Sequence, residues 1–337
     1  MTMSSNLPRH AGSAGEERLH MLRDKGFQHE ALLYSGTEQF VTGTARFIRE
    51  GLGGGEAVLV AVIEPRASLL RDELGSDAPE VEFLDMADVG RNPARIIPAW
   101  QDWVERNAAA GRGFRGIGEP IWPTRTRTEI VECLHHERLL NTAFAPGPAW
   151  SLLCPYDVRA LPPEVIEHAG HTHPAVVRQG GKFPSASYPH EDPRAEDLFA
   201  APLPDAGPAP LCELWFDIDD LSRLRAAVHR HAPALHLDPR RVPDFVLTVS
   251  ELAANSICYG GGKGRVRLWR EGPHAVCEVH DDGLITDPLV GRRKPNPRER
   301  IGGAGLWTVN QLCDLVLISS TKEHGTTVRA YLYGRAS

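Results

Sequence analysis

The sequence predicts an α/β protein of two domains joined by a proline-rich linker, and three observations support this fold class. The chain has 337 residues, about twice the roughly 150 residues of a typical domain. Strand-like apolar runs alternate with helical patterns in both halves, as in α/β layers. Seven of the 27 prolines fall within residues 184–210. We therefore expect a flexible tail at 1–26, a first domain at 27–180, a linker at 181–211 and a second domain at 212–334.

The first half has the pattern of a mostly parallel sheet. Ala57–Ile63 is a continuous apolar run suited to a strand buried on both faces. The other expected elements are strands at Glu30–Ser35, Val81–Leu84, Phe114–Gly118 and Trp150–Cys154, and helices at Thr37–Gly51 and Pro98–Gly111. Strands that alternate with helices in this way favour parallel pairing.

The second half predicts a mixed or antiparallel sheet. Asp219 or Asp220 is expected to cap a short helix. Asp238 and Pro239 are expected to begin a longer helix that runs to about Tyr259. The remaining expected elements are strands at Glu213–Ile218, Arg265–Arg270, Ala275–His280, Leu315–Ser319 and Thr326–Leu332, and a helix at Leu306–Leu312.

Charge and composition argue against two classes of function. The net charge is −7, which is unsuited to general binding of a nucleic-acid backbone. The longest strongly apolar stretch, Ala57–Ile63, is far shorter than the roughly 20 residues that cross a bilayer. The first residues lack the apolar core of a secretory signal, and the six cysteines contain no C-x-x-C pair. We therefore expect a cytoplasmic protein with no direct nucleic-acid or membrane partner.

Four short elements in the second half form a candidate site. Glu251 and Asn255 lie four residues apart on the long helix, so they share a face and could hold Mg²⁺ with a water. Asp281-Asp282-Gly283 follows a strand, and Gly325–Val328 begins another. Gly302–Gly305 precedes a helix whose N-terminus offers N–H groups to a phosphate. Each element is common alone, but the four in this order favour a functional site.

Residues 212–334 resemble a GHKL (Bergerat) ATP-binding domain, the α/β sandwich with a mixed sheet found in gyrase and histidine kinases. Ser250–Asn255 (SELAAN) is similar to the helix motif of the anti-sigma-factor serine/threonine kinases. The resemblance implies that Asn255 coordinates Mg²⁺ for ATP. It also implies that Glu251 orients or deprotonates the attacking hydroxyl.

The same resemblance assigns roles to the other elements. It implies that Asp281 accepts the adenine amino group beside Gly283, and that Thr326 supports this contact through water. Gly303 and Gly305 would hinge a lid over the phosphates, and the basic loop Arg292–Arg300 matches that lid in position.

The first half has its own resemblance, to the MEDS (DcmR-like sensory) domain. It covers about 27–180 and implies a reduced RecA/KaiC-like α/β sheet domain that senses an unknown small ligand. No phosphate-binding G-x-x-x-x-G-K-[ST] motif is present, so we expect no nucleotide hydrolysis there. The similar motifs are His29–Tyr34, Gly118–Trp122, His136-Glu137 with Asn141, Cys154–Asp157 and His173-Pro174.

Together the resemblances imply a cytoplasmic signalling regulator, in which a sensory domain controls an ATP-dependent serine/threonine protein kinase. Its partner would be an anti-sigma antagonist or a sigma factor, which it phosphorylates or sequesters, and homodimer formation stays open. The alternative is a binding module that switches partners without phosphoryl transfer, because Tyr259 stands where the family commonly has histidine. A two-component histidine kinase has little support, since prolines in the linker oppose the helical hairpin that such enzymes need.

The first half also contains two sets of residues whose roles the sequence leaves open. One set of potential metal ligands matches no standard zinc spacing, and we favour packing roles for Cys133, His135, His136, Cys154, His171 and His173. A second set either lines a ligand pocket or contributes to the core, namely Glu119, Trp122, Glu137 and Tyr156.

Overall fold

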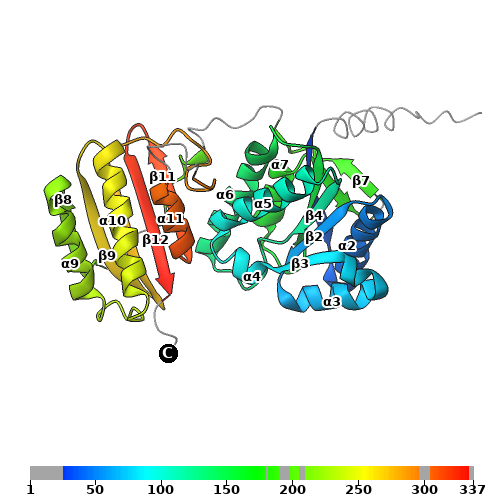
Figure 1. Ribbon diagram of the computed structural model, residues 1–337, viewed down its shortest axis with the longest axis horizontal. Helices are drawn as coiled ribbons and strands as arrows, with labels where there is room; N and C mark the ends of the chain where they lie inside the picture. The colour runs from blue at the N-terminus through cyan, green and yellow to red at the C-terminus, as the bar shows by residue number, and fades with distance from the viewer. Residues whose placement is uncertain (1–25, 180, 190–197, 205–208, 296–303, 334–337) are drawn as a thin grey trace, which may run out of the picture. The chain divides into compact units, whose positions relative to one another are not determined.

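The computed structural model describes residues 26–179, 181–189, 198–204, 209–295 and 304–333. Its strands form a seven-stranded sheet and a five-stranded sheet, each with its own helices (Figure 1). The tail expected at 1–26 lies outside the described residues, except for Gly26. Within the described residues, no helix is long and apolar enough to cross a membrane.

The first sheet is parallel except at one edge, as the sequence predicts. Its strand order is β3-β2-β4-β5-β1-β6-β7, and β7 runs antiparallel to β6. All six residues of β2 are buried. The strands are β1 (Phe27–Tyr34), β2 (Ala57–Val62), β3 (Val81–Asp85), β4 (Phe114–Gly118), β5 (Trp150–Asp157), β6 (Ala175–Arg178) and β7 (Gly181–Pro184).

Helices cover both faces of this sheet. Alternate residues of a strand point to opposite faces. Tyr34 of β1 therefore packs on Phe40 of α2 (Gly36–Gly53), with ring centroids 5.3 Å apart. His29 points to the other face, where it meets Asn141 of α6 (Arg127–Phe144). The remaining helices are α3 (Glu64–Leu74), α4 (Met86–Val89), α5 (Ile96–Ala109) and α7 (Pro163–Thr172), with 3₁₀ turns η1 (Gly75–Glu80) and η2 (Pro93–Arg95).

The second sheet has the strand order β11-β12-β10-β9-β8. Each pairing is antiparallel, so the mixed sheet given by the family resemblance is corrected to an antiparallel one. Short hairpins join β9 to β10 and β11 to β12, so connectivity makes these two pairings antiparallel. The strands are β8 (Cys212–Phe216), β9 (Gly264–Glu271), β10 (His274–Asp281), β11 (Leu315–Thr321) and β12 (Gly325–Tyr333).

Three helices pack on one face of the second sheet and complete a two-layer α/β sandwich. They are α9 (Leu221–His231), α10 (Val242–Tyr259) and α11 (Ala304–Leu312). Phe245 and Val249 of α10 are buried against the sheet residues Val266 and Val279. Full burial of such a side chain stabilises the fold by about 1.5–3 kcal/mol, so α10 is firmly fixed to the sheet.

The start of α9 lies where the sequence predicts it, with Asp220 as its N-cap residue, although the Asp220 side chain makes no capping hydrogen bond to α9. The Asp217 carboxylate accepts a hydrogen bond from the Asp219 N–H at 3.0 Å, and Asp220 completes a capping box. This cap opens a short 3₁₀ turn, η3 (Ile218–Asp220), which leads into α9. Aspartate side chains favour such local turns.

The start of α10, in contrast, differs from the prediction. The Asp238 carboxylate accepts a hydrogen bond from the Arg240 N–H at 2.9 Å and closes a turn. The helix itself begins at Val242, with Pro243 in its first turn. This helix thus starts a few residues after its predicted position, because the Asp238 turn precedes it.

Several elements of the first domain, a strand and three helices among them, are not predicted by the sequence patterns. Strand β7 falls within 181–211, the segment expected to be linker, and pairs with β6. The patterns also leave out α3, α6 and α7. In α6 the charged or polar residues His136 and Glu137 are fully buried, which hides the usual apolar stripe of an amphipathic helix.

Candidate functional site

The candidate site of the second domain is a cavity of about 380 Å³ beside the C-terminal half of α10. Its walls are mostly apolar and come from the helix, the sheet and the loop after β10. A few polar groups converge on it, which is typical of small-molecule sites. The residues that define it include Leu252, Asn255, Val279, Asp281, Ile285 and Thr326.

The carboxylate of Asp281 is held in one orientation at the end of β10. Its Oδ2 accepts a hydrogen bond from the Ser256 hydroxyl of α10 at 2.6 Å. Its Oδ1 accepts one from the Gly283 N–H at 2.8 Å. A carboxylate oxygen can accept more than one hydrogen bond, so Asp281 can also receive an amino group of a ligand.

Three glycines allow the backbone to approach Asp281 closely. A Cβ atom on Gly260 would overlap the Asp281 side chain, and one on Gly325 would overlap its carbonyl oxygen. A Cβ atom on Gly283 would lie 2.8 Å from the Tyr259 carbonyl oxygen. Gly325 also has φ of 69°, a conformation that glycine adopts without strain. The site therefore requires glycine at these positions.

A chain of hydrogen bonds fixes the loop that follows β10. The Thr326 hydroxyl donates to the Gly283 carbonyl oxygen at 2.9 Å, and its oxygen lies 2.7 Å from the Ser320 hydroxyl. Ser320 accepts from the Ile285 N–H at 2.9 Å. Thr326 therefore positions Gly283, and with it the polar end of the cavity.

Glu251 and Asn255 lie where α10 meets the start of α11. A Cβ atom on Gly305 would stand 3.0 Å from both the Glu251 Oε2 and the Asn255 Oδ1. The N-terminus of a helix carries partial positive charge, which favours the Glu251 carboxylate at this place. Side-chain oxygens of this type are the ligands that Mg²⁺ prefers.

The structure brings most of the predicted site residues together. Asn255, Asp281, Gly283 and Thr326 share the cavity, and Glu251 and Gly305 adjoin Asn255. Gly303 and residues 296–300 of the predicted lid lie outside the described residues.

Sequence reasoning missed Ser256 and Ser320, which hold Asp281 and Thr326 in place. Ser256 directly follows Asn255 on α10, so its side chain points to a different side of the helix. No local pattern identifies either serine, because the contacts depend on how α10 packs on the sheet and how β11 pairs with β12.

The cavity suits a planar base with an exocyclic amino group. Its volume of about 380 Å³ lies within the range of about 300–1,000 Å³ for small-ligand sites. The apolar walls can enclose an aromatic ring while Asp281 accepts a hydrogen bond from its edge. The Asn255 amide and the start of α11 offer groups for a metal ion and for phosphate.

Two of the pocket residues considered from the sequence, Glu137 and Tyr156, lie beside His173. The Tyr156 ring centroid is 5.5 Å from that of His173, and a Glu137 carboxylate oxygen lies within 4.8 Å of a His173 ring nitrogen. Glu119, fully buried, forms an ion pair with Arg66. Trp122 lies against the Arg125 guanidinium, 3.8 Å from the ring centroid. Near Arg66, burial raises the pKa of Tyr34 to about 12, although the guanidinium charge opposes this shift.

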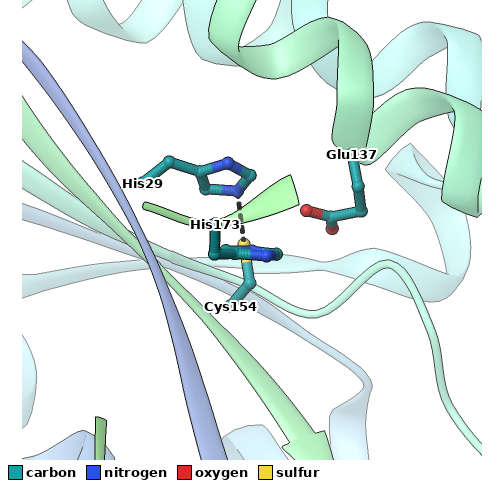
Figure 2. A group of neighbouring side chains, drawn as sticks. All are labelled: His29, Glu137, Cys154 and His173. Atoms are coloured by element: carbon teal, nitrogen blue, oxygen red, sulfur yellow. Dashed lines mark hydrogen bonds between the residues drawn. The ribbon is translucent and has the colours of Figure 1, made fainter. Parts of the chain in front are cut away.

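Two of the potential metal ligands come together in the first domain, and they have unexpected neighbours. Cys154 and His173 lie in one buried group with His29 and Glu137 (Figure 2). The other four considered from the sequence lie on helices outside this group, namely Cys133, His135 and His136 on α6 and His171 on α7.

The fold of the second domain is an α/β sandwich consistent with an ATP-binding domain. Comparison with protein families agrees, since residues 214–332 match the histidine kinase-like ATPase domain. Residues 28–174 match MEDS, the methanogen/methylotroph, DcmR sensory domain. The chain therefore combines a MEDS domain with a histidine kinase-like ATPase domain. A search of the curated proteins gave no significant match.

Proposed function

We propose that the second domain is an ATP-dependent serine/threonine protein kinase of the anti-sigma-factor type, which the MEDS domain controls in response to a small ligand. The observation that carries the proposal is the position of Glu251 and Asn255, one turn apart on α10 and next to the cavity of Asp281. The ATPase-domain match supports nucleotide binding, and the helix motif SELAAN supports the kinase type.

Each residue has a separate task in this proposal. Asp281 accepts a hydrogen bond from the adenine amino group. Asn255 contributes a ligand for Mg²⁺, and the ion neutralises phosphate charge. Glu251 orients the serine or threonine hydroxyl of the protein partner and accepts its proton, so that the oxygen bonds to the terminal phosphorus while ADP leaves. Positioning and charge neutralisation supply most of the catalysis in such transfers, so the chain needs no covalent intermediate.

The partner that fits this activity is an anti-sigma antagonist, which the kinase phosphorylates on a hydroxyl side chain. The second expected partner is a sigma factor, and the same domain sequesters it when the antagonist is phosphorylated. Phosphorylation of the antagonist is linked to sequestration of the sigma factor, because the phosphate adds a charge of about −1.5 to −2. This charge can release the antagonist from the domain, which leaves the domain available to the sigma factor.

The kinase activity is tested by transfer of the labelled γ-phosphate of ATP to such an antagonist. The Glu251→Gln variant should retain nucleotide binding and lose about 10²–10⁴-fold in transfer rate, the range for a lost general base. Asp244→Asn is the matched control, because Asp244 lies on the same helix in a surface ion pair with Arg241. Equal transfer by Glu251→Gln and the wild type would refute the assigned role.

Tyr259 favours a second candidate function, a binding module in which ATP controls partner affinity without phosphoryl transfer. The residue lines the cavity and is 60% exposed. A phenol there does not supply the imidazole that the kinase motif commonly has. In this case partner affinity differs between the ATP and ADP states, while the partner acquires no label. Labelled partner in the wild type excludes this candidate.

A further inference from the structure

We infer that the MEDS domain binds one divalent transition-metal ion of the Zn²⁺ class through His29, Glu137, Cys154 and His173. One potential ligand atom from each side chain lies within 4.8 Å of the other three. All four residues are buried, with exposed fractions of 0–1%. Figure 2 shows the two imidazoles one above the other beside the Cys154 sulfur, with the Glu137 carboxylate facing them. This inference does not depend on the nucleotide site.

The group is assembled by elements that are distant in sequence. His29 lies on β1 and Cys154 on the neighbouring parallel strand β5, where it is paired with Ala31. His173 directly follows α7, and Glu137 lies on α6. Because strands and helices hold the ligands, the group is part of the folded framework of the domain.

The hydrogen bonds of His29 show which of its nitrogens faces the group. The Asn141 Nδ2 donates to the Thr172 carbonyl oxygen at 2.8 Å, which fixes the orientation of the Asn141 amide. Its Oδ1 therefore accepts from the His29 Nδ1, at 3.2 Å. The neutral His29 ring then carries its lone pair on Nε2, which lies 3.3 Å from the Cys154 sulfur.

His173 is oriented in the same way. Its Nδ1 lies 2.9 Å from the Ala169 carbonyl oxygen, which can only accept a hydrogen bond. The neutral ring therefore has its lone pair on Nε2. The rings of His29 and His173 are neighbours, with centroids 3.8 Å apart. In metal sites the second ring nitrogen of a histidine ligand is usually hydrogen-bonded in this manner, so both histidines are prepared as ligands.

The chemistry of the ligand set selects the class of metal. Thiolate and imidazole favour Zn²⁺ and similar ions over Mg²⁺ or Ca²⁺. With Zn–N of about 2.0–2.1 Å and Zn–S of about 2.3 Å, ligand nitrogen and sulfur atoms in a tetrahedral site stand about 3.5 Å apart. The distance between His29 Nε2 and Cys154 Sγ is 3.3 Å. The Cys154 thiolate and Glu137 carboxylate together carry the charge that a divalent ion neutralises.

Four protein ligands leave no coordination position open, so the ion would contribute to stability. Binding releases the Cys154 thiol proton, and the sulfur and the metal ion form the new bond. Because the ligands come from β1, β5, α6 and the end of α7, the ion connects both histidine-bearing segments to α6. We therefore expect metal removal to lower the unfolding temperature of the MEDS domain.

Cobalt titration of the chelator-treated full chain tests the inference, because Co²⁺ occupies Zn²⁺ sites and has visible absorption. One equivalent should bind, with the bands of tetrahedral Co²⁺ and a thiolate-to-cobalt charge-transfer band, and Zn²⁺ should displace it. Cys154→Ser should abolish the charge-transfer band. Cys133→Ser is the matched control, since Cys133 is also buried in this domain but lies outside the group.

Two further variants test the inference independently, in case Cys154→Ser does not fold. His29→Gln should weaken Co²⁺ binding by more than about 100-fold, which exceeds the usual loss for a residue outside the ligand set. Asn141→Ala removes only the residue that positions His29, so it should weaken binding about 10–100-fold and retain the charge-transfer band. The inference is overturned if the wild type binds no Co²⁺ stoichiometrically, or if the Cys133 and Cys154 variants behave alike.

Discussion

At the scale of single residues, the cavity of Asp281 depends on how closely α10, the loop after β10 and α11 approach one another. Ser256 and Gly283 hold Asp281, while Gly305 allows α11 to approach Glu251 and Asn255. A small side chain at position 305 would displace the Glu251 and Asn255 side chains rather than the backbone. A substitution of Gly305 can therefore change ligand binding without reducing the stability of the fold.

Gly305→Ala should weaken Mg²⁺–ATP binding by about tenfold without loss of stability. The added Cβ would stand 3.0 Å from oxygens of Glu251 and Asn255, so both side chains must shift, at a cost near that of one hydrogen bond. Alanine also favours the helix by about 0.5–1 kcal/mol over glycine. Calorimetric titration and thermal unfolding measure both effects.

Gly53→Ala serves as the control, since its added Cβ would meet nothing within 4 Å. Unchanged ATP affinity in Gly305→Ala, together with an unchanged fold, would show that Asn255 does not take part in nucleotide binding.

At the scale of elements, α10 has both a structural and a functional face. Phe245 and Val249 anchor it in the core, and Glu251 and Asn255 lie at its polar edge. One helix thus fixes the site to the most buried part of the domain, so the position of these side chains depends on the integrity of the core.

Phe245→Ala should reduce the free energy of unfolding of the second domain by about 3–5 kcal/mol, the usual cost of deleting a buried phenylalanine ring. Phe245 is fully buried. Leu247→Ala on the same helix is the control, because Leu247 is 41% exposed, and it should cost less than about 1 kcal/mol. Denaturant unfolding, followed by tryptophan fluorescence, measures the difference. Equal losses in the two variants would contradict the assignment of the core face.

The sequence predicts the elements of the second domain well and the ligand group of the first domain poorly, for a physical reason. Glu251 and Asn255 lie four residues apart, so helical spacing alone puts them on one face. His29 and Cys154 meet only because β1 pairs with β5, and hydrophobic patterns do not determine strand order. His29 is therefore missing from the potential metal ligands considered from the sequence, although Cys154 and His173 are among them.

At the scale of the whole molecule, buried titratable groups limit the alkaline stability of both domains. Burial raises the pKa of Cys313 from 9.0 to about 12, and of Tyr34 from 10.0 to about 12. In each case the native state retains a proton that the unfolded state loses. The resulting stability is present below the unfolded pKa and is lost as pH rises through the folded pKa.

We expect the free energy of unfolding of the second domain to fall between pH 9 and 12. Cys313→Ala should reduce this slope by about 1.4 kcal/mol per pH unit, the contribution of one proton. Cys258→Ala, which changes an exposed cysteine, should leave the slope unchanged. Denaturant unfolding at several alkaline pH values measures the slopes. The same slope in Cys313→Ala and the wild type would contradict the account.

Calorimetric titration of the full chain with Mg²⁺–ATP tests the central claim, nucleotide binding in the cavity of Asp281, most directly. We predict one bound ATP per chain in the wild type. Asp281→Asn should weaken binding at least about tenfold, because an amide N–H₂ then opposes the adenine amino group. Asp282→Asn, at the exposed neighbouring position, should bind like the wild type. Absence of ATP binding to the wild type, or equal affinities in the wild type and Asp281→Asn, would contradict it.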